Sequence, residues 1–546
     1  MKKNIGKIKI LFLLLGLFSC NDFGDVNIDP TKPTSMDPGK QLIYAQMRYT
    51  GDNSIQLRSG IGIIIPLLQQ ASGNFTTNSG ATYAYSESIY SRVWLSDYPG
   101  VVRELIDASD NLAGDPDKTN LYAMVRIMKV ITFLRLTDLY GDIPYSEATR
   151  GYSDLIVRPK YDRQEDIYND FFKELKESHD MLDAGKDQVP QDQYYGGDIA
   201  KWKKLANSLR FRLAMRLTKV NPAKAQQEAE AAFAAGLMES NDDICYIKYE
   251  NVQGSATDFR GNALSTAILA MADPPRFNTT FLDILNPPSN EGPVDPRLDG
   301  YSRCYLSLTP LVGGAALYTR ADVTEQVRNH YAAAGNAAIN GVIGLQPGAV
   351  SFVNNPAVQN ITVDVPGRGS VTLVNKDQRR QMATYLYYMD APALIVTYSE
   401  IALLLAEAKV RGWNMGSTTA EEYYQAGIRA SIDQLSLFRD APAFEGVDEF
   451  VESKTLTPGD ELKEINTELY ISLFLNPQEN FANWRRSGYP ELEPAGPPGR
   501  PIPRRLQYPL NEIEQNNGNV EEATKLISGV EPGKDSYLNR VWWDKE

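Results

Sequence analysis

Few side chains in this chain could act as nucleophiles, proton-transfer groups or metal ligands of the usual kinds. Its 546 residues include three cysteines and two histidines, and neither histidine lies in a recognisable motif. Zinc sites and serine–histidine or cysteine–histidine catalysis depend on these residue types. The sequence also lacks a GxSxG elbow, a P-loop, an HExxH pair and an EF-hand ladder. It therefore predicts no catalytic residue, no metal site and no cofactor.

Paired carboxylates are the one catalytic arrangement that the composition leaves open. Two acids flank the scissile bond in most glycoside hydrolases. The chain has 69 Asp and Glu residues, and their distances in the folded protein cannot be read from the sequence. A surface glycoside hydrolase is therefore kept as an alternative.

The context of Cys20 indicates chemistry of another kind, which is export followed by acylation. Four lysines lie within the first nine residues, the apolar stretch Ile10–Phe18 follows, and Ser19 precedes Cys20. These parts form a secretory signal, because the stretch is far shorter than the roughly 20 residues that a transmembrane helix needs. A cysteine at the junction resembles the lipobox of bacterial lipoproteins. We expect residues 1–19 to be a signal peptide and Cys20 the lipidation site; an ordinary signal peptide with an incidental Cys20 is the alternative.

The mature chain is strongly acidic. Removal of residues 1–19 takes away four lysines and no acid, which changes the formal net charge from −14 to −18. This charge argues against a nucleic-acid partner and against adsorption to anionic lipid, since both require a basic surface. The two remaining cysteines, Cys245 and Cys304, can form a disulfide after export or stay as buried thiols. The sequence leaves both arrangements open.

The elements that must position any site are mostly helical. Residues 20–39 are polar, contain Pro30, Pro33 and Pro38, and indicate a flexible tether. From residue 40 on, apolar residues recur at steps of three and four, as in helices with one buried face. Several helices form antiparallel pairs of the tetratricopeptide kind, without a clean 34-residue period. The expected helices span residues 41–50, 54–71, 87–112, 118–139, 164–183, 200–218, 223–235, 392–413, 419–438 and 458–475.

Residues 250–390 are rich in Gly, Pro and Asn and predict an irregular region. Its clearest element is Ile361–Val374, where β-branched residues alternate around Pro366-Gly367-Arg368-Gly369, a pattern typical of a β-hairpin. Irregular segments on a rigid scaffold commonly carry binding residues. The sequence thus predicts a mostly α-helical fold with a loop-rich region that contains a small hairpin.

Six motifs follow Cys20 along the chain. They are Asn27-Ile28-Asp29-Pro30, Asp138–Ala148 (DLYGDIPYSEA), Trp202–Arg216, Tyr398–Trp413, Trp484–Pro490 and Arg504–Pro509. Together they resemble the SusD/RagB family of outer-membrane lipoproteins from Bacteroidota. The resemblance implies one domain over residues 40–546, built on tetratricopeptide-like helix pairs that form a right-handed α-superhelical scaffold.

The resemblance also implies a partner and a function. Proteins of this family lie as a lid over a SusC-like TonB-dependent transporter barrel. They deliver an oligosaccharide, or in some relatives a peptide, and catalyse no reaction. Asp22 and Asp25 are similar to the acidic signals that send such lipoproteins to the outer face of the outer membrane. The prediction is therefore a glycan-binding surface lipoprotein; a peptide-binding relative and a helical adaptor that binds only protein are further alternatives.

Two groups of residues are candidates for ligand contact, because sugars pack on aromatic faces and bind polar side chains in a cleft. The first group lies in a region where the resemblance places ligand contacts, and the second flanks Asp295-Pro296-Arg297. For each residue, internal packing or a structural ion pair is the alternative. The candidates are Asn74, Phe75, Tyr83, Tyr85, Tyr90, Arg276, Phe277, Arg297, Tyr301, Arg303 and Tyr305.

Other conspicuous residues are predicted to be structural. We expect Trp94, Trp202 and Trp413 to pack between helices, and Gly141 to end a helix with a positive φ. Arg485 and Arg486 are expected to pair with buried acids. These residues are therefore not counted among the ligand contacts.

Overall fold

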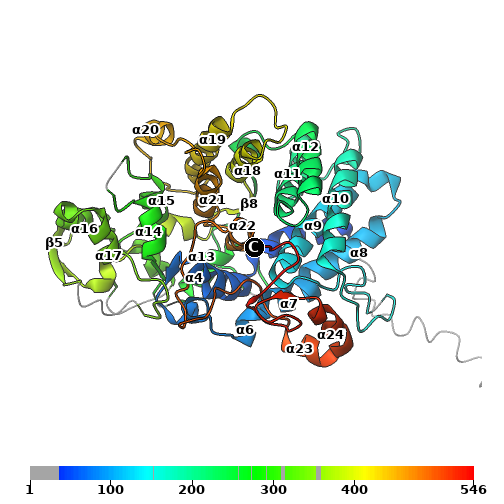
Figure 1. Cartoon of the computed structure of the whole chain (residues 1–546), viewed down its shortest axis with the longest axis horizontal. Coiled ribbons are helices and arrows are strands. Elements are labelled where there is room, and N and C mark those ends of the chain that lie inside the picture. Colours follow the sequence, from blue (N-terminus) through cyan, green and yellow to red (C-terminus); the bar gives the residue numbers. More distant parts are fainter. Residues whose placement is uncertain are drawn as a thin grey trace, which may run out of the picture.

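The computed structural model describes residues 36–546 apart from 152, 256, 272, 290–291, 309–313 and 352–357. The predicted signal peptide, Cys20 and the tether up to residue 35 lie outside the described residues. Figure 1 shows helix pairs on one side of the molecule and short helices and strands on the other. Among the described helices, none combines the length and the hydropathy that crossing a lipid bilayer requires.

Antiparallel helix pairs build the scaffold, which confirms the predicted mostly helical fold. Consecutive helices pack against each other from α9 to α12, and α18 packs against both α19 and α21. The scaffold helices are α9 (Thr119–Tyr140), α10 (Gln164–Met181), α11 (Ile199–Arg216), α12 (Pro222–Ala235), α18 (Tyr398–Val410), α19 (Ala420–Asp433), α20 (Val447–Glu452), α21 (Glu461–Ser472) and α22 (Pro477–Ser487).

Local sequence signals set the ends of these helices. The Asp198 side chain accepts a hydrogen bond from the Lys201 amide (3.2 Å) and caps α11. Asn221 caps α12 in the same way, and Pro222 occupies its first turn. Gly141 follows α9 with φ of +90°, as predicted, because glycine adopts this conformation without a steric penalty.

The helical region before α9 is more broken than predicted. Pro66 and Pro99 lack the amide that would continue a regular helical ladder, and a π-helical stretch lies beside or around each of them. The elements are α2 (Pro38–Gly51), α3 (Asn53–Ile55), η1 (Gln56–Ile64), α4 (Ile65–Leu67), η2 (Phe75–Thr77), α5 (Asn78–Thr82), α6 (Glu87–Tyr90), α7 (Arg92–Asp97), η3 (Tyr98–Val102), α8 (Arg103–Leu112) and η4 (Pro116–Lys118).

The strands are short and form four small sheets. One sheet has the order β1-β3-β7-β4, and the predicted hairpin is confirmed as β5 paired with β6, with Ile361 opposite Leu373. The expected helix over residues 392–413 is wrong in its first part, because the apolar run at 393–396 pairs with β2. The strands are β1 (Ala71–Ser72), β2 (Cys245–Ile247), β3 (Arg276–Phe277), β4 (Ser302–Arg303), β5 (Ile361–Val365), β6 (Gly369–Leu373), β7 (Gln381–Met382), β8 (Ala393–Val396), β9 (Ser528–Gly529) and β10 (Asn539–Arg540).

Short helices complete the loop-rich region and the C-terminal part. In Figure 1, α14, α16 and α17 lie at the left and α23 and α24 at the bottom. The elements are η5 (Asn241–Asp243), α13 (Ala263–Leu269), α14 (Thr279–Leu285), α15 (Arg297–Tyr301), η6 (Gly314–Thr319), α16 (Thr324–Tyr331), η7 (Ala332–Ala334), α17 (Asn336–Ile343), η8 (Asn375–Asp377), η9 (Thr384–Tyr387), η10 (Gln434–Leu437), α23 (Leu510–Gln515) and α24 (Asn517–Lys525).

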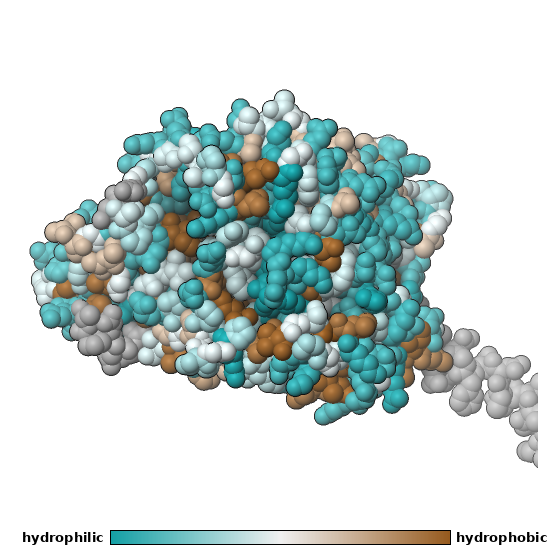
Figure 2. Space-filling model, in the orientation of Figure 1, coloured by the Kyte–Doolittle hydropathy of each residue, from teal (hydrophilic) through white to brown (hydrophobic). Residues whose placement is uncertain are grey.

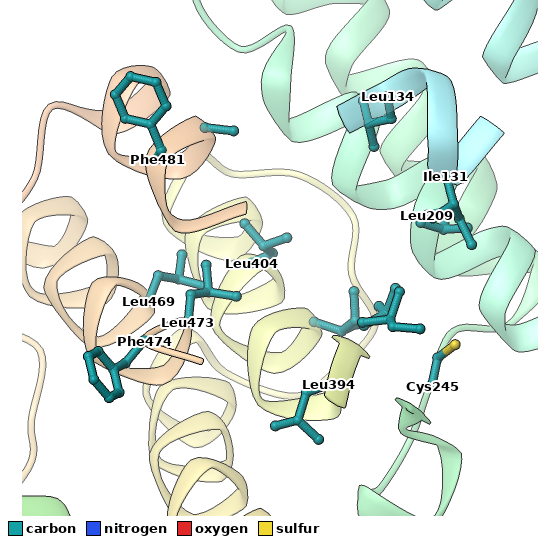
Figure 3. Packing of buried hydrophobic residues seen from close by; sticks show 14 of the residues in the cluster. Ile131, Leu134, Leu209, Cys245, Leu394, Leu404, Leu469, Leu473, Phe474 and Phe481 are labelled. Atoms are coloured by element: carbon teal, nitrogen blue, oxygen red, sulfur yellow. The ribbon is translucent and has the colours of Figure 1, made fainter. Parts of the chain in front are cut away.

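A continuous hydrophobic core joins the scaffold to the loop-rich region. Figure 3 shows Ile131 of α9 beside Leu209 of α11. Cys245 and Cys304 are both buried and free, so the two thiols are not bonded. Figure 2 shows mostly hydrophilic residues on the visible face, with small hydrophobic patches between them. Burial of apolar surface in this core supplies most of the folding free energy.

Charged residues of the sequence motifs are buried inside the scaffold. Arg486 donates to both carboxylate oxygens of Glu407 at 2.6 and 2.7 Å, as expected for an arginine with a buried acid. The expectation for Arg485 is wrong: its guanidinium donates to the backbone carbonyls of Phe481 (3.1 Å) and Arg504 (2.9 Å). Burial lowers the pKa of Arg485 to about 10. These motifs therefore hold the scaffold together.

Candidate functional site

The beginnings of the two predicted groups of ligand residues come together at the sheet β1-β3-β7-β4. Strand β1 precedes the first group and pairs with β3 of the second group, with Ser72 opposite Arg276. The Asn74 side-chain amide donates to the backbone carbonyl of Asp273 at 2.9 Å. Residues almost 200 positions apart in the sequence are thus neighbours at one edge of this sheet.

Phe75 is the most exposed large apolar residue of this neighbourhood. Its side chain is 90% exposed and lies at the start of the short turn η2. The Asn74 side chain fixes that turn. Its Oδ1 atom accepts a hydrogen bond from the Thr76 backbone amide (2.8 Å), and its Nδ2 atom donates to the Asp273 backbone carbonyl. We call residues 74–77 the Phe75 turn. It presents an aromatic face to solvent on a backbone that is held from both sides, which is a suitable surface for stacking a ligand.

A group of charged side chains lies directly beside the Phe75 turn. The Asp273 carboxylate lies 2.8 Å from an Arg276 nitrogen, 3.5 Å from Lys376 Nζ and 3.9 Å from an Arg320 nitrogen. Arg276 is fully buried, whereas the Lys376 side chain is 22% exposed. Lys376 is therefore the member of this group that a ligand can reach as a hydrogen-bond donor.

Tyrosines cover the other side of this neighbourhood. The half-buried Tyr318 shares a hydrogen bond with Ser265 Oγ (2.7 Å), and its ring lies 5.8 Å from Tyr387 and 5.4 Å from Tyr388. Tyr387 belongs to a small hydrophobic cluster that also contains Met271, a contact of Asn74. Burial raises the pKa of Tyr318.

Sequence reasoning missed Asp273, Tyr318, Lys376 and Tyr388. None of them lies in a periodic pattern, and the contact of Asp273 with the Phe75 turn accompanies the pairing of β1 with β3, two segments far apart in the sequence. The tyrosine-rich run Tyr385–Tyr388 is the one local signal that could have pointed to this side of the site.

The other residues of the first group lie against the C-terminal part of the chain. The Tyr83 hydroxyl accepts from the Ala495 amide (2.8 Å), and the Tyr90 ring lies 5.7 Å from that of Tyr537. Both are 1% exposed. Tyr85 is 40% exposed and its ring lies 5.1 Å from that of Tyr90. Of these three tyrosines, Tyr85 is the one that presents a ring to solvent.

The remaining residues of the second group are buried. Arg297 binds Asp295 and Glu468, each at 2.6 Å, and the Tyr301 ring lies 5.2 Å from that of Phe474. Tyr305 is 5% exposed, and Arg320 Cζ lies over its ring, 5.1 Å from the ring centroid. Phe277 is also buried, and the Arg303 guanidinium lies 3.6 Å from Asp322.

A cavity of about 480 Å³ opens beside α15, α16 and α17. Its lining includes Asp299, Arg328 and Arg380, and the Asp299 carboxylate pairs with both arginines. These three charges are therefore paired with one another. Across the described residues, no cluster of three His, Cys, Asp or Glu side chains could hold a metal ion.

The fold and this neighbourhood define a class of protein: a helical scaffold whose loops present aromatic and charged side chains at the surface. The family model for SusD-like proteins, described as starch-binding and associating with the outer membrane, matches residues 31–509. The chain belongs to this SusD-like family.

Solved structures agree with that assignment. A chitin-binding protein is 33% identical, with 93% of this chain and all of that chain covered and a TM-score of 0.75. A SusD-like protein from Bacteroidetes is 30% identical, with 94% and 100% coverage and a TM-score of 0.81. A chitin-binding SusD homologue from Flavobacterium johnsoniae shares the fold at 24% identity, with 93% and 98% coverage and a TM-score of 0.68. No curated protein matches the chain closely enough to add to these comparisons.

Proposed function

We propose that this protein binds an oligosaccharide at the Phe75 turn and catalyses no reaction on it. The observation that carries the proposal is the 90% exposed Phe75, held on a fixed turn beside hydrogen-bonding side chains. An aromatic face with polar neighbours is the combination that sugar rings bind. The family description as starch-binding and the 33% identical chitin-binding protein support a glycan ligand.

The predicted site residues divide into two roles in this proposal. Asn74, Phe75 and Tyr85 contact the ligand, together with Lys376 and Tyr318. The buried residues hold the segments that carry these contacts: Tyr83, Tyr90, Arg276, Arg297, Tyr301 and Tyr305. This division follows exposure, because a side chain without accessible surface can act on a ligand only through a neighbour.

Isothermal titration with chitohexaose and maltoheptaose tests the site. Phe75→Ala should weaken binding of the bound sugar by about two- to ten-fold, since an aromatic stacking contact contributes about 0.5–1.5 kcal/mol. Leu155→Ala is the matched control, because Leu155 is also exposed (81%) and lies outside the neighbourhood described above. Equal affinity of the Phe75→Ala variant and the wild type would remove the Phe75 turn from the site.

The same samples test the absence of catalysis and the ligand class. No reducing sugar should be released during prolonged incubation with either oligosaccharide. Release would support the hydrolase alternative with its paired carboxylates. Binding of peptides, with no binding of any oligosaccharide in a broad panel, would support the peptide-binding alternative.

We further propose that Cys20 anchors the protein to the outer membrane, facing outward, as a lid over a SusC-like TonB-dependent transporter. The domain of residues 40–546 would receive the sugar and pass it to the barrel. The family description as associating with the outer membrane supports this arrangement. A Cys20→Ala variant should be lost from the outer-membrane fraction and from a complex with the barrel, while the purified domain keeps its ligand affinity. Retention of that variant in the membrane would contradict the anchor.

A further inference from the structure

A second cavity of about 500 Å³ lies between the start of α11 and residues 241–248. Tyrosine, lysine and asparagine side chains line it, among them Tyr195, Lys201, Asn241 and Lys248. It has no residue in common with the Phe75 turn or with the charged group around Asp273. Any ligand of this cavity would therefore occupy a separate site.

One wall of the cavity is held in a fixed position by the buried carboxylate of Asp192. That carboxylate accepts hydrogen bonds from the backbone amides of Tyr194 and Tyr195, each at 3.0 Å, and from the Trp202 indole at 2.8 Å. The Tyr195 hydroxyl donates to the Asp243 carbonyl at 2.9 Å, and its ring lies edge-on to Trp202. The half-buried Tyr195 ring is thus preorganised on the cavity wall.

Two cationic groups line the cavity, those of Lys201 and Lys248. Lys201 Nζ donates to the backbone carbonyl of Asp242 (2.8 Å), and Lys248 Nζ lies 5.7 Å from the centre of the Tyr246 ring. Among the described residues, no carboxylate lies within 4.0 Å of either ammonium group, and the nearby Asp243 is paired with Lys204 at 2.9 Å. Asp242 is the acidic residue of the lining, and it is exposed. Two ammonium groups against one exposed acid favour an anionic ligand, although the chain as a whole is acidic.

The side chain of Asn241 also lines the cavity. Asn241 Nδ2 donates to the Ala430 carbonyl at 3.0 Å, which fixes the orientation of the side-chain amide. Its Oδ1 atom is buried and has no hydrogen-bond partner in the described part of the chain. A buried acceptor without a partner costs free energy. A ligand hydroxyl that enters the cavity could donate to it.

We infer that this cavity binds an acidic sugar unit, with the ring against Tyr195 and Tyr246, a hydroxyl on Asn241, and a carboxylate or sulfate group at Lys201 and Lys248. The choice of a sugar rests on the proposed function, whereas the preference for an acid rests on the two lysines. The site would let the protein hold a glycan that carries negative charge at a position separate from the Phe75 turn.

Titration with trigalacturonate and with a sulfated heparin disaccharide tests the inference and separates the two acidic groups. The double variant Lys201→Gln/Lys248→Gln should bind the preferred acid at least about ten-fold more weakly, because hydrogen bonds to charged groups are lost. Asp242→Asn should strengthen binding by about two-fold, since it removes a like charge. Lys203→Gln is the matched control, because Lys203 is on the same helix and does not line the cavity. Binding should also weaken as salt increases.

Failure of this inference can be told apart from failure of the proposed function. The Phe75→Ala variant should keep the wild-type affinity for the acidic probe, and the double lysine variant should keep the wild-type affinity for the neutral oligosaccharide. Absence of acidic-sugar binding, or binding that the lysine variants leave unchanged, would overturn the inference and leave the Phe75 site standing. Lysine-dependent binding of an acidic peptide without binding of either acidic sugar would also overturn it.

Discussion

The helical scaffold and the charged group around Asp273, in the loop-rich region of residues 250–390, use charged side chains differently. In the scaffold, Arg212 donates to both oxygens of Glu400 at 2.6 Å, and Arg486 is bound to Glu407 in the same bidentate way. In the loop-rich region, three cations surround the single carboxylate of Asp273 at distances from 2.8 to 3.9 Å, and one of them is partly exposed. The scaffold pairs are short and closed to solvent, so they stabilise helix packing. The looser group leaves a donor available to a ligand.

Aromatic residues show the same division. Trp202 of the scaffold is fully buried between Tyr194 and Tyr195, and Tyr470 donates to the Leu68 carbonyl at 2.7 Å. At the β1 edge, Phe75 contributes almost none of its surface to packing. Residues that are conspicuous in the sequence therefore have two different uses. Exposure, rather than residue type, separates structural side chains from candidates for binding.

The largest expected effect comes from opening a scaffold pair. Glu407→Gln should lower the free energy of unfolding by about 3–5 kcal/mol, because Arg486 would be left as a buried charge without its carboxylate. Urea unfolding at pH 7 measures the change. Asp448→Asn is the control: Asp448 pairs with Arg429 at 2.7 Å on the surface, and its loss should cost less than about 1 kcal/mol. Equal losses of unfolding free energy in the two variants would show that the buried and the exposed ion pair contribute equally to stability.

The pH dependence of the same pair gives the next largest effect. Burial alone would raise the pKa of Glu407, but Arg486 and Arg411 lower it from 4.5 to about 2. A carboxylate with a depressed pKa stabilises the fold fully above its unfolded pKa, and this contribution is lost as the pH falls through the folded value. The difference in unfolding free energy between wild type and Glu407→Gln should therefore shrink by about 3 kcal/mol between pH 5 and pH 2. Urea unfolding curves measured over this pH range test the prediction. A constant difference in unfolding free energy would contradict the stabilising role of the Glu407–Arg486 pair.

The scaffold could be predicted from sequence because its signals are local. Caps such as Asp198 and Asn221 and the apolar stripe of α11 lie within one helix, so periodicity finds them. The hairpin of β5 and β6 was predictable for the same reason, since its turn and both strands are contiguous. The interruptions at Pro66 and Pro99 and the strand β8 were missed, because a π-helical stretch and a pairing with β2 depend on packing partners elsewhere in the chain.

The proximity of some candidate residues could be predicted from the sequence, whereas their exposure and their other neighbours could not. Sequence reasoning named Asn74, Phe75 and Arg276, and the pairing of β1 with β3 brings these residues together. It could not separate exposed Phe75 from buried Tyr83, because both are aromatic residues in one polar segment. Asp273 and Lys376 could not be identified from the sequence, because only the folded chain places them side by side.

Two buried tyrosines differ in whether the side-chain hydroxyl has a hydrogen-bond partner. Tyr301 and Tyr470 are fully buried and both contact Phe281, but among the described residues Tyr301 has no hydrogen-bond partner for its hydroxyl. Tyr470→Phe should lower the unfolding free energy by about 1 kcal/mol, whereas Tyr301→Phe should change it by less than about 0.5 kcal/mol or raise it. Thermal and urea unfolding measure both. A loss in Tyr301→Phe as large as that in Tyr470→Phe would show that the Tyr301 hydroxyl has a structural partner.

The smallest expected change is the stability of the Phe75→Ala variant. Because 90% of the Phe75 surface is already exposed, its removal takes almost no apolar area out of the core, and the unfolding free energy should change by less than about 0.5 kcal/mol. Phe281→Ala is the buried counterpart and should cost about 3–5 kcal/mol. If Phe75→Ala destabilises the protein by several kcal/mol, Phe75 packs against the protein in solution, and the proposal that it meets a sugar ring loses its main support.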